Sequence, residues 1–164
     1  IETAPQNARR IFTGTDIAAD VDSVWRVLTD YAQLQTVVPS LVANEVLEIR
    51  ADGGARLRQV GGAKIFPGVT FKAKMTVDVA GGVPPPLRGH AAAPQVLRRD
   101  LPVPGDFDHY QGVWRMQELP GCSIGGQPVT RLTYAVELRP KGFLPVGLIE
   151  GRIAADLKAN MVAI

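Results

Sequence analysis

The stretch VTFKAKMTVDV, residues Val69–Val79, decides the fold class of this 164-residue chain. Apolar and polar side chains alternate along its whole length, so one face is apolar while the other carries threonine, lysine and aspartate. A period of two residues is the pattern of a β-strand with one face on a core and the other in solvent. The stretch therefore predicts a half-buried strand of an antiparallel sheet.

Segments on both sides of this strand show the same tendency and are also predicted as strands. A turn at Asp52-Gly53-Gly54 joins two of them, because Asp-Gly suits the tight turn of a hairpin. The proline- and glycine-rich segment Ala80–Pro94 is predicted as a long loop. The sequence thus predicts a sheet of about six to seven strands. The further strands are Arg9–Ile17, Val42–Ile49, Ala55–Val60, Gln95–Leu101, Tyr110–Glu118 and Thr130–Leu138.

Helices are predicted at both ends of this run of strands. After Asp20, whose carboxylate can accept from the free amides of a first turn, apolar residues from Val21 to Leu28 follow helical spacing. Gln33–Val38 is predicted as a second, short helix. A long helix opens at Pro145, where the missing N–H costs nothing, and runs to the end of the chain. Its apolar stripe consists of Ile149, Ile153, Leu157, Met161 and Ile164.

The order of these elements predicts an α+β fold in which a curved antiparallel sheet surrounds the long C-terminal helix. Each strand offers one apolar face, and only two helices carry apolar stripes, so curling the sheet around the long helix buries most apolar surface. Such an arrangement leaves an internal apolar space where inner side chains do not fill it, and small hydrophobic ligands bind in such spaces. We expect residues 1–164 to form one ligand-binding domain.

Composition excludes several other classes of protein. The net charge is +2, and aromatic residues do not alternate with basic ones as they do in single-strand binders, so we expect no nucleic acid. The single cysteine, Cys122, excludes an internal disulfide and a cysteine zinc cluster. No apolar stretch approaches the ~18 residues of a membrane span.

The sequence offers no recognisable catalytic motif. His90 lies in the predicted loop, and no Gly-x-Ser-x-Gly motif or phosphate-binding glycine loop is present. The cluster of Asp106, Asp108 and His109 has ligand types that suit a divalent ion, but such residues beside a strand more often shape a turn. We therefore expect no catalytic residue, no metal site and no cofactor.

The candidate ligand-binding residues are those predicted to face the interior of the sheet. Arg58 and Gln59 lie on opposite faces of a strand, so one points inward, where it can hydrogen-bond a quinone or carboxylate oxygen. Phe66 and Phe107 are placed in loops at the mouth. The alternative for each residue is that it simply fills a core. The remaining candidates are Phe71, Met75, Trp114, Met116 and Tyr134 from strands and Ile149, Ile153 and Leu157 from the long helix.

A family resemblance begins with DVDSVWRVLTDYAQLQTVVPSLVANEVLE, residues Asp20–Glu48. With Trp25 in an apolar helix, Thr29-Asp30-Tyr31 behind it and Pro39-Ser40-Leu41 before a strand, it resembles the N-terminal signature of the START-like superfamily. That superfamily is also called polyketide cyclase/dehydrase and lipid transport. The resemblance implies the helix-grip fold, in agreement with the curved sheet predicted above.

Four later segments are similar to the cyanobacterial and plastid branch of that superfamily, which is itself similar to the coenzyme Q-binding protein family. The loop Gly81-Gly82-Val83-Pro84 departs from the branch, which carries an acidic residue there. The resemblance implies a chloroplast location (stroma or thylakoid-associated) or a cyanobacterial cytoplasm; the start at Ile1 is compatible with a removed targeting segment. The segments are LRQVGGAKIF (57–66), GDFDHYQGVW (105–114), TRLTYAVELRPKGFLPVGLIE (130–150) and DLKANMVAI (156–164).

Three hypotheses of function follow. We expect non-catalytic binding or transport of a hydrophobic small molecule, such as an isoprenoid quinone, a lipid or a pigment precursor, in the internal cavity. The first alternative is an enzyme of the polyketide cyclase/dehydrase type, for which the sequence shows no obvious acid–base pair. The second is an assembly or interaction subunit of a larger plastid complex that keeps the fold without a ligand. Transient contact with a membrane surface and a protein partner both stay open.

Overall fold

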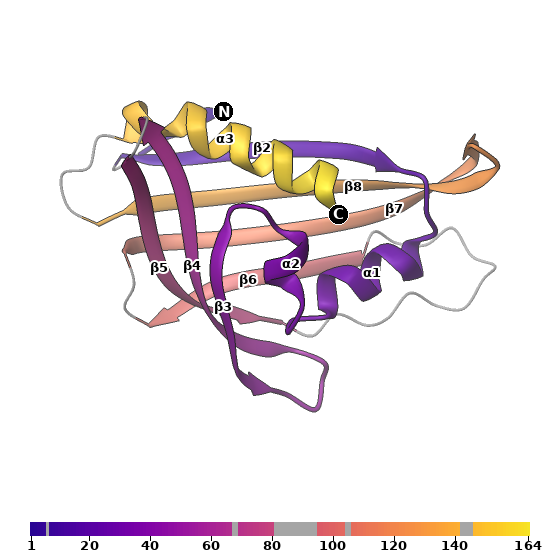
Figure 1. Ribbon diagram of the computed structural model, residues 1–164, viewed down its shortest axis with the longest axis horizontal. Helices are drawn as coiled ribbons and strands as arrows, with labels where there is room; N and C mark the ends of the chain where they lie inside the picture. Colours follow the sequence, from indigo (N-terminus) through magenta and orange to yellow (C-terminus); the bar gives the residue numbers. More distant parts are fainter. Residues whose placement is uncertain (6, 67–68, 81–94, 104–105, 142–145) are drawn as a thin grey trace.

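A computed structural model describes residues 1–5, 7–66, 69–80, 95–103, 106–141 and 146–164, with backbone alone at 63–66, 69–71, 95–103 and 146–149. Its described elements form an α+β fold with one antiparallel sheet (Figure 1). In chain order they are β1 (Glu2–Ala4), β2 (Ala8–Ile17), α1 (Val21–Thr29), α2 (Leu34–Val37), β3 (Leu41–Ile49), β4 (Ala55–Phe66), β5 (Val69–Val79), β6 (Gln95–Val103), β7 (Phe107–Ile124), β8 (Gln127–Pro140) and α3 (Val146–Ala163).

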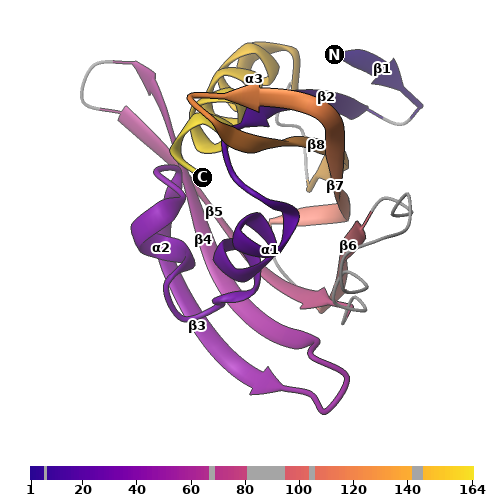
Figure 2. The ribbon, with the colours of Figure 1, turned by 90° about the vertical axis from the view of Figure 1, so that its right-hand side faces the viewer.

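The sheet has eight strands in the order β1-β2-β8-β7-β6-β5-β4-β3. Helix α3 packs against both β2 and β4, although four strands separate these two in the sheet. The sheet must therefore curl around the helix, and Figure 2 shows this curvature directly. Arg9 on β2 also forms an ion pair with Glu150 of α3. The curved sheet around a C-terminal helix confirms the predicted helix-grip arrangement.

The alternation that predicted the strands is seen in their burial. On β5, Ala73, Val77 and Val79 are buried, whereas Lys72 and Lys74 are exposed. Strands β4, β7 and β8 are longer than the predicted segments, and β4 continues through Gly61 and Gly62, beyond the predicted end at Val60. The eighth strand, β1, has only three residues and was not predicted.

Helix α1 begins where the sequence predicts. The Asp20 carboxylate accepts a hydrogen bond from the Ser23 backbone N–H at 2.6 Å, which satisfies one free amide of the first turn. Val21, Val24 and Leu28 are buried against the sheet, and Trp25 is half-buried. The apolar stripe therefore holds α1 on the concave face that also receives α3 (Figure 1).

The β3–β4 hairpin is joined to the end of α1. Gly53 adopts a φ of 79°, which favours glycine, and the Asp52 carboxylate accepts from the Gly54 N–H at 2.8 Å. The Tyr31 hydroxyl donates to the Gly53 carbonyl at 2.9 Å, and the Asn44 amide donates to the Tyr31 carbonyl at 2.7 Å. Tyr31 therefore ties the helix end to the hairpin.

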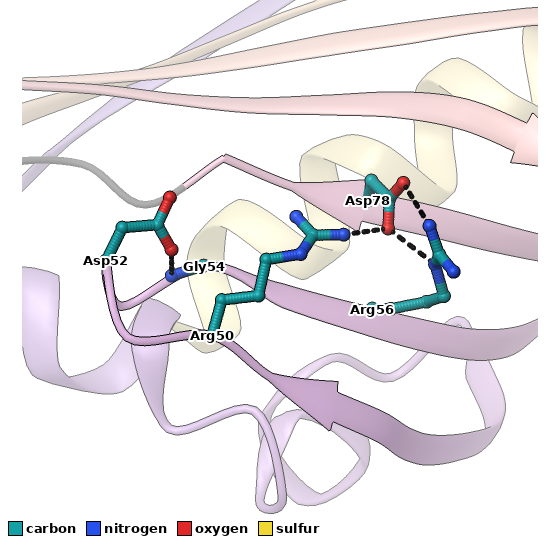
Figure 3. A network of polar contacts seen from close by, with 5 residues as sticks. All are labelled: Arg50, Asp52, Gly54, Arg56 and Asp78. Carbon is teal, nitrogen blue, oxygen red and sulfur yellow. Dashed lines mark hydrogen bonds and ion pairs between the residues drawn. The ribbon is translucent and has the colours of Figure 1, made fainter.

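An ionic cluster stands on the outer face of β4 and β5 (Figure 3). Asp78 accepts hydrogen bonds from Arg56 at 2.9 and 3.0 Å and from Arg50 at 2.5 Å. The hydrogen bonds from Arg56 are the main reason that the pKa of the Asp78 carboxyl lies below its ordinary value. The hydrogen bond and the positive charge of Arg50 lower this pKa further, although partial burial opposes the shift. The cluster joins the β3–β4 turn to the neighbouring strand β5.

Several predictions concern residues that the structure does not describe. The predicted loop Ala80–Pro94 lies, apart from Ala80, outside the described residues, as does Pro145 at the start of the long helix.

Cys122 is exposed as a free thiol on β7. Within the described ranges, no helix has the length and apolar character needed to cross a membrane.

Candidate functional site

A cavity of about 130 Å³ lies between α3 and the concave face of the sheet, and its walls are mainly apolar. A cavity of comparable size, ~150 Å³, holds one benzene ring in another protein. The part bounded by described residues therefore has room for a ring-sized group. Its lining residues are Ser40, Gly61, Gly62, Ala73, Met75, Phe107, Tyr110, Val136, Leu138, Ile153, Asp156 and Leu157.

The cavity exists because the strands under α3 present small residues there. Gly61 and Gly62 on β4 and Ala73 on β5 leave space that larger side chains would fill. A Cβ atom added at Gly61 would lie 3.7 Å from the Met75 side chain, an ordinary contact distance. From above, α3 contributes Ile153 and Leu157, which are only half-buried. The space therefore results from the small side chains on β4 and β5.

Two tyrosines form the polar part of one wall. The hydroxyl oxygens of Tyr110 on β7 and Tyr134 on β8 lie 2.7 Å apart and share a hydrogen bond. Tyr110 lines the cavity, and Tyr134 is 2% exposed. The Tyr134 ring lies over Gly112, where an added Cβ would be 2.5 Å from its hydroxyl. Glycine at 112 therefore makes room for the phenol that reaches Tyr110.

Two further polar residues of the lining are already paired. The Asn160 side chain of α3 donates to Ser40 Oγ at 2.7 Å and accepts from the Ser40 backbone N–H at 3.2 Å. Asp156 accepts an ion-pair contact from Arg152 one turn earlier on α3, at 2.8 Å. Asn160 thereby fastens α3 to the segment before β3, which forms one side of the cavity.

Four of the sequence-predicted site residues line this cavity: Met75, Phe107, Ile153 and Leu157. Phe107 was expected in a loop, but it is the first residue of β7. Its ring centroid lies 5.8 Å from that of Tyr110. Phe66 likewise ends β4 and does not lie in a loop. The side chains of Phe66, Phe71 and Ile149 lie outside the described residues.

Three other predicted residues lie in the packed core beside the cavity. The rings of Trp114 and Tyr134 are stacked, with centroids 4.2 Å apart and planes inclined by 24°. Met116 is 1% exposed. None of the three belongs to the described lining, although Tyr134 reaches the cavity through its bond to Tyr110.

Of the two polar candidates on β4, Gln59 is the one that points inward. It is 3% exposed and donates to Asn44 Oδ1 at 2.9 Å. Arg58 points outward and pairs with Glu45 at 2.9 Å, with both side chains about 60% exposed. The inward residue, left open between Arg58 and Gln59 by the sequence, is therefore Gln59, whose amide is bonded to Asn44. Neither residue is part of the described cavity lining.

Sequence reasoning missed several lining residues. Tyr110 lies on the same face of β7 as Trp114, so the period of two contained the signal that it faces inward. Val136 and Leu138 follow Tyr134 on β8 in the same way. Ser40 had no such signal, because it reaches the cavity through its bonds to Asn160, 120 residues later.

The cluster of Asp106, Asp108 and His109 lies at the start of β7, and Asp106 bonds to the neighbouring strand β5. Asp106 accepts from the Lys74 backbone N–H at 2.7 Å, and His109 is half-buried, with Nε2 3.8 Å from Glu137. Among the residues that the structure describes, no group of three or more His, Cys, Asp or Glu side chains is placed to hold a metal ion.

Solved structures with this fold come from several bacteria. The chain is similar to TTHA0849 from Thermus thermophilus, with 20% identity, a TM-score of 0.65 and coverage of 94% of this chain and 90% of that one. It is similar to the Zhui aromatase/cyclase from Streptomyces sp. R1128, with 17% identity, a TM-score of 0.67 and coverage of 95% and 90%. A START superfamily protein from Mycobacterium smegmatis shares 14% identity over 93% and 97%, with a TM-score of 0.58.

These identities are low, so the structural likeness establishes the fold. The search of curated proteins found no significant match. The family model for polyketide cyclase / dehydrase and lipid transport matches residues 17–163, which include both α1 and α3 and all the lining residues of the cavity. The chain therefore belongs to the polyketide cyclase/dehydrase and lipid transport family.

Proposed function

We propose that this protein binds and carries a hydrophobic small molecule in the cavity under α3. The observation that supports this proposal is the mainly apolar cavity between the concave face of the sheet and α3. Burial of apolar ligand surface there contributes about 25 cal/mol per Å². An isoprenoid quinone, a lipid or a pigment precursor is the ligand class of the proposal, and a plastid or cyanobacterial setting remains part of it.

Native mass spectrometry of the protein purified from its source organism tests the proposal. We expect a bound small molecule that organic solvent extracts and that a Leu157→Trp variant no longer holds. Leu157 lines the cavity, so an indole at this position fills the space that the ligand needs.

The matched control is Lys158→Trp, which places the same side chain on the exposed face of α3. This variant should keep the ligand. An empty wild-type protein that co-purifies with a large complex would contradict the proposal and favour the assembly-subunit alternative.

One observation favours catalysis of the cyclase/dehydrase type as a second candidate. The Tyr110 phenol and the Asp156 carboxyl line the same cavity, and a proton donor and acceptor close to one ligand suit general acid–base work. Catalysis predicts that Tyr110→Phe and Asp156→Asn abolish turnover while binding persists. Equal loss of binding and turnover would favour the carrier.

A further inference from the structure

We propose that Tyr110, held in place by Tyr134, selects neutral ligands that carry a carbonyl oxygen on or next to a ring. This inference rests on the proposed function, because it assigns a ligand class to the same cavity. It makes Tyr110 the residue that distinguishes such ligands from hydrocarbons of the same shape and from anions.

Charge is the first argument. Among the lining residues that the structure describes, Asp156 carries the one carboxyl group, and none is a lysine, arginine or histidine; Arg152, the ion-pair partner of Asp156, is not part of that lining. Arg58, which suits a ligand carboxylate, faces solvent on the other side of the sheet. An anion entering this cavity would lose its hydration without gaining a cation partner, which is costly. The described walls therefore favour a neutral ligand.

Hydrogen bonding is the second argument. A phenol hydroxyl has one hydrogen to donate and lone pairs to accept. When Tyr134 donates to Tyr110 across the 2.7 Å contact, the hydrogen of Tyr110 is available to the cavity that Tyr110 lines. A chain of two hydroxyl groups polarises the outer one and strengthens the bond that it donates. A ligand carbonyl oxygen is the acceptor that completes this chain.

The surroundings of Tyr134 make it a positioning residue. Its ring is stacked on Trp114 at 4.2 Å and fits over Gly112, so the hydroxyl has little freedom to move away from Tyr110. The Phe107 ring, 5.8 Å from that of Tyr110, covers the apolar side of the same wall. A ring against these side chains would place an attached carbonyl beside the Tyr110 hydroxyl.

Affinities of three probes for the full chain test the proposal: acetophenone, ethylbenzene and benzoate, measured by NMR titration. Acetophenone and ethylbenzene have similar size, and acetophenone alone of the two carries a carbonyl group. We expect Tyr110→Phe to weaken acetophenone about threefold to tenfold, the worth of one neutral hydrogen bond, and to change ethylbenzene less than about twofold. Benzoate should bind the wild type at least about tenfold more weakly than acetophenone.

The control is Tyr31→Phe, which removes another buried tyrosine hydroxyl, one bonded to Gly53 and absent from the cavity lining. It should leave all three affinities unchanged. The infrared carbonyl band of bound acetophenone gives a second readout, since a phenol donor lowers its frequency. We expect this shift to vanish in Tyr110→Phe and to shrink in Tyr134→Phe.

Two failures are distinguishable. If acetophenone and ethylbenzene both bind the wild type, and Tyr110→Phe changes their affinities equally or not at all, the selection by Tyr110 is wrong while the carrier function stands. Benzoate binding as tightly as acetophenone would likewise overturn the selection. If neither neutral probe binds the wild type, the proposed function fails and this inference fails with it.

Discussion

The two ends of the concave face differ, although the same strands build both. At the packed end, Leu57 and Val77 pair across β4 and β5, Met116 and Leu132 pair across β7 and β8, and all four are at most 1% exposed. At the cavity end of the same strands, Gly61 pairs with Ala73, and small side chains leave the space under α3. Strand geometry is shared, so side-chain size decides which end is a core and which end is hollow.

The comparison separates stability from function within one sheet. Close packing at one end provides the burial that a folded domain needs. The cavity end forgoes part of that burial, and it also carries the Tyr110 hydroxyl on its wall. Shortening or enlarging a side chain should therefore change the free energy of unfolding more at the packed end than at the cavity end.

The largest effect is expected from removing a large side chain at the packed end. Leu132→Ala should lower the free energy of unfolding by about 2–5 kcal/mol, because Leu132 is 0% exposed and its loss leaves a void. Leu157→Ala at the cavity end should cost under about 2 kcal/mol, since Leu157 is half-buried beside existing space. Urea unfolding measures both, and equal losses would contradict the division.

Enlarging an alanine at each end should give a smaller contrast. Ala55 is 0% exposed at the packed end, so Ala55→Leu overpacks the core and should cost about 1–3 kcal/mol. Ala73→Leu places the same side chain in the cavity and should stay within about 1 kcal/mol of the wild type. Thermal unfolding checks the pair; a larger loss at Ala73 than at Ala55 would show that the cavity end is the more tightly packed.

The smallest effect is expected on the outer face, where the ionic cluster of Asp78 bears on neither end of the concave face. Asp78→Asn should cost about 1 kcal/mol at neutral pH, because it weakens the bonds from Arg56 and Arg50. Glu45→Gln, in a more exposed pair with Arg58, should cost under about 0.5 kcal/mol and serves as the control.

The pH dependence of the same variant has a definite sign. The pKa of Asp78 is lowered in the folded protein, chiefly by the hydrogen bonds from Arg56. The contribution of ionised Asp78 to the free energy of unfolding is therefore complete above the ordinary carboxyl pKa of about 4. The contribution is lost as the pH falls through the lower folded value. The stability difference between wild type and Asp78→Asn should therefore shrink on acidification, as urea unfolding at several pH values can show. A difference that grows in acid would refute this assignment.

The sequence carried most of the information about the fold. Alternation on β5, the Asp20 cap and the stripe containing Ile153, Leu157 and Met161 are local signals, and the structure bears them out in the residues that it describes. The end of β4 was misjudged: the predicted strand stops at Val60, whereas in the sheet Gly61 and Gly62 continue it by pairing with β5.

The candidate site was less predictable, because a cavity depends on what remains unfilled after packing. Periodicity places Trp114 and Tyr110 on the same face, but it does not tell which of them meets a neighbour and which meets empty space. Gln59 shows the same limit. Alternation places either Gln59 or Arg58 inside without deciding between them. The structure bonds the inward Gln59 to Asn44 of the adjacent strand β3, outside the described cavity lining.

The most direct test of the central claim is a titration with ethylbenzene followed by ¹³C methyl NMR. The account predicts saturable shifts, with one dissociation constant, for the methyl groups of Met75, Leu138 and Leu157 in the cavity. The methyl groups of Met116 and Leu132 at the packed end should hardly move. Shifts confined to the packed end or to exposed residues such as Ile49, or shifts that never saturate, would contradict the account.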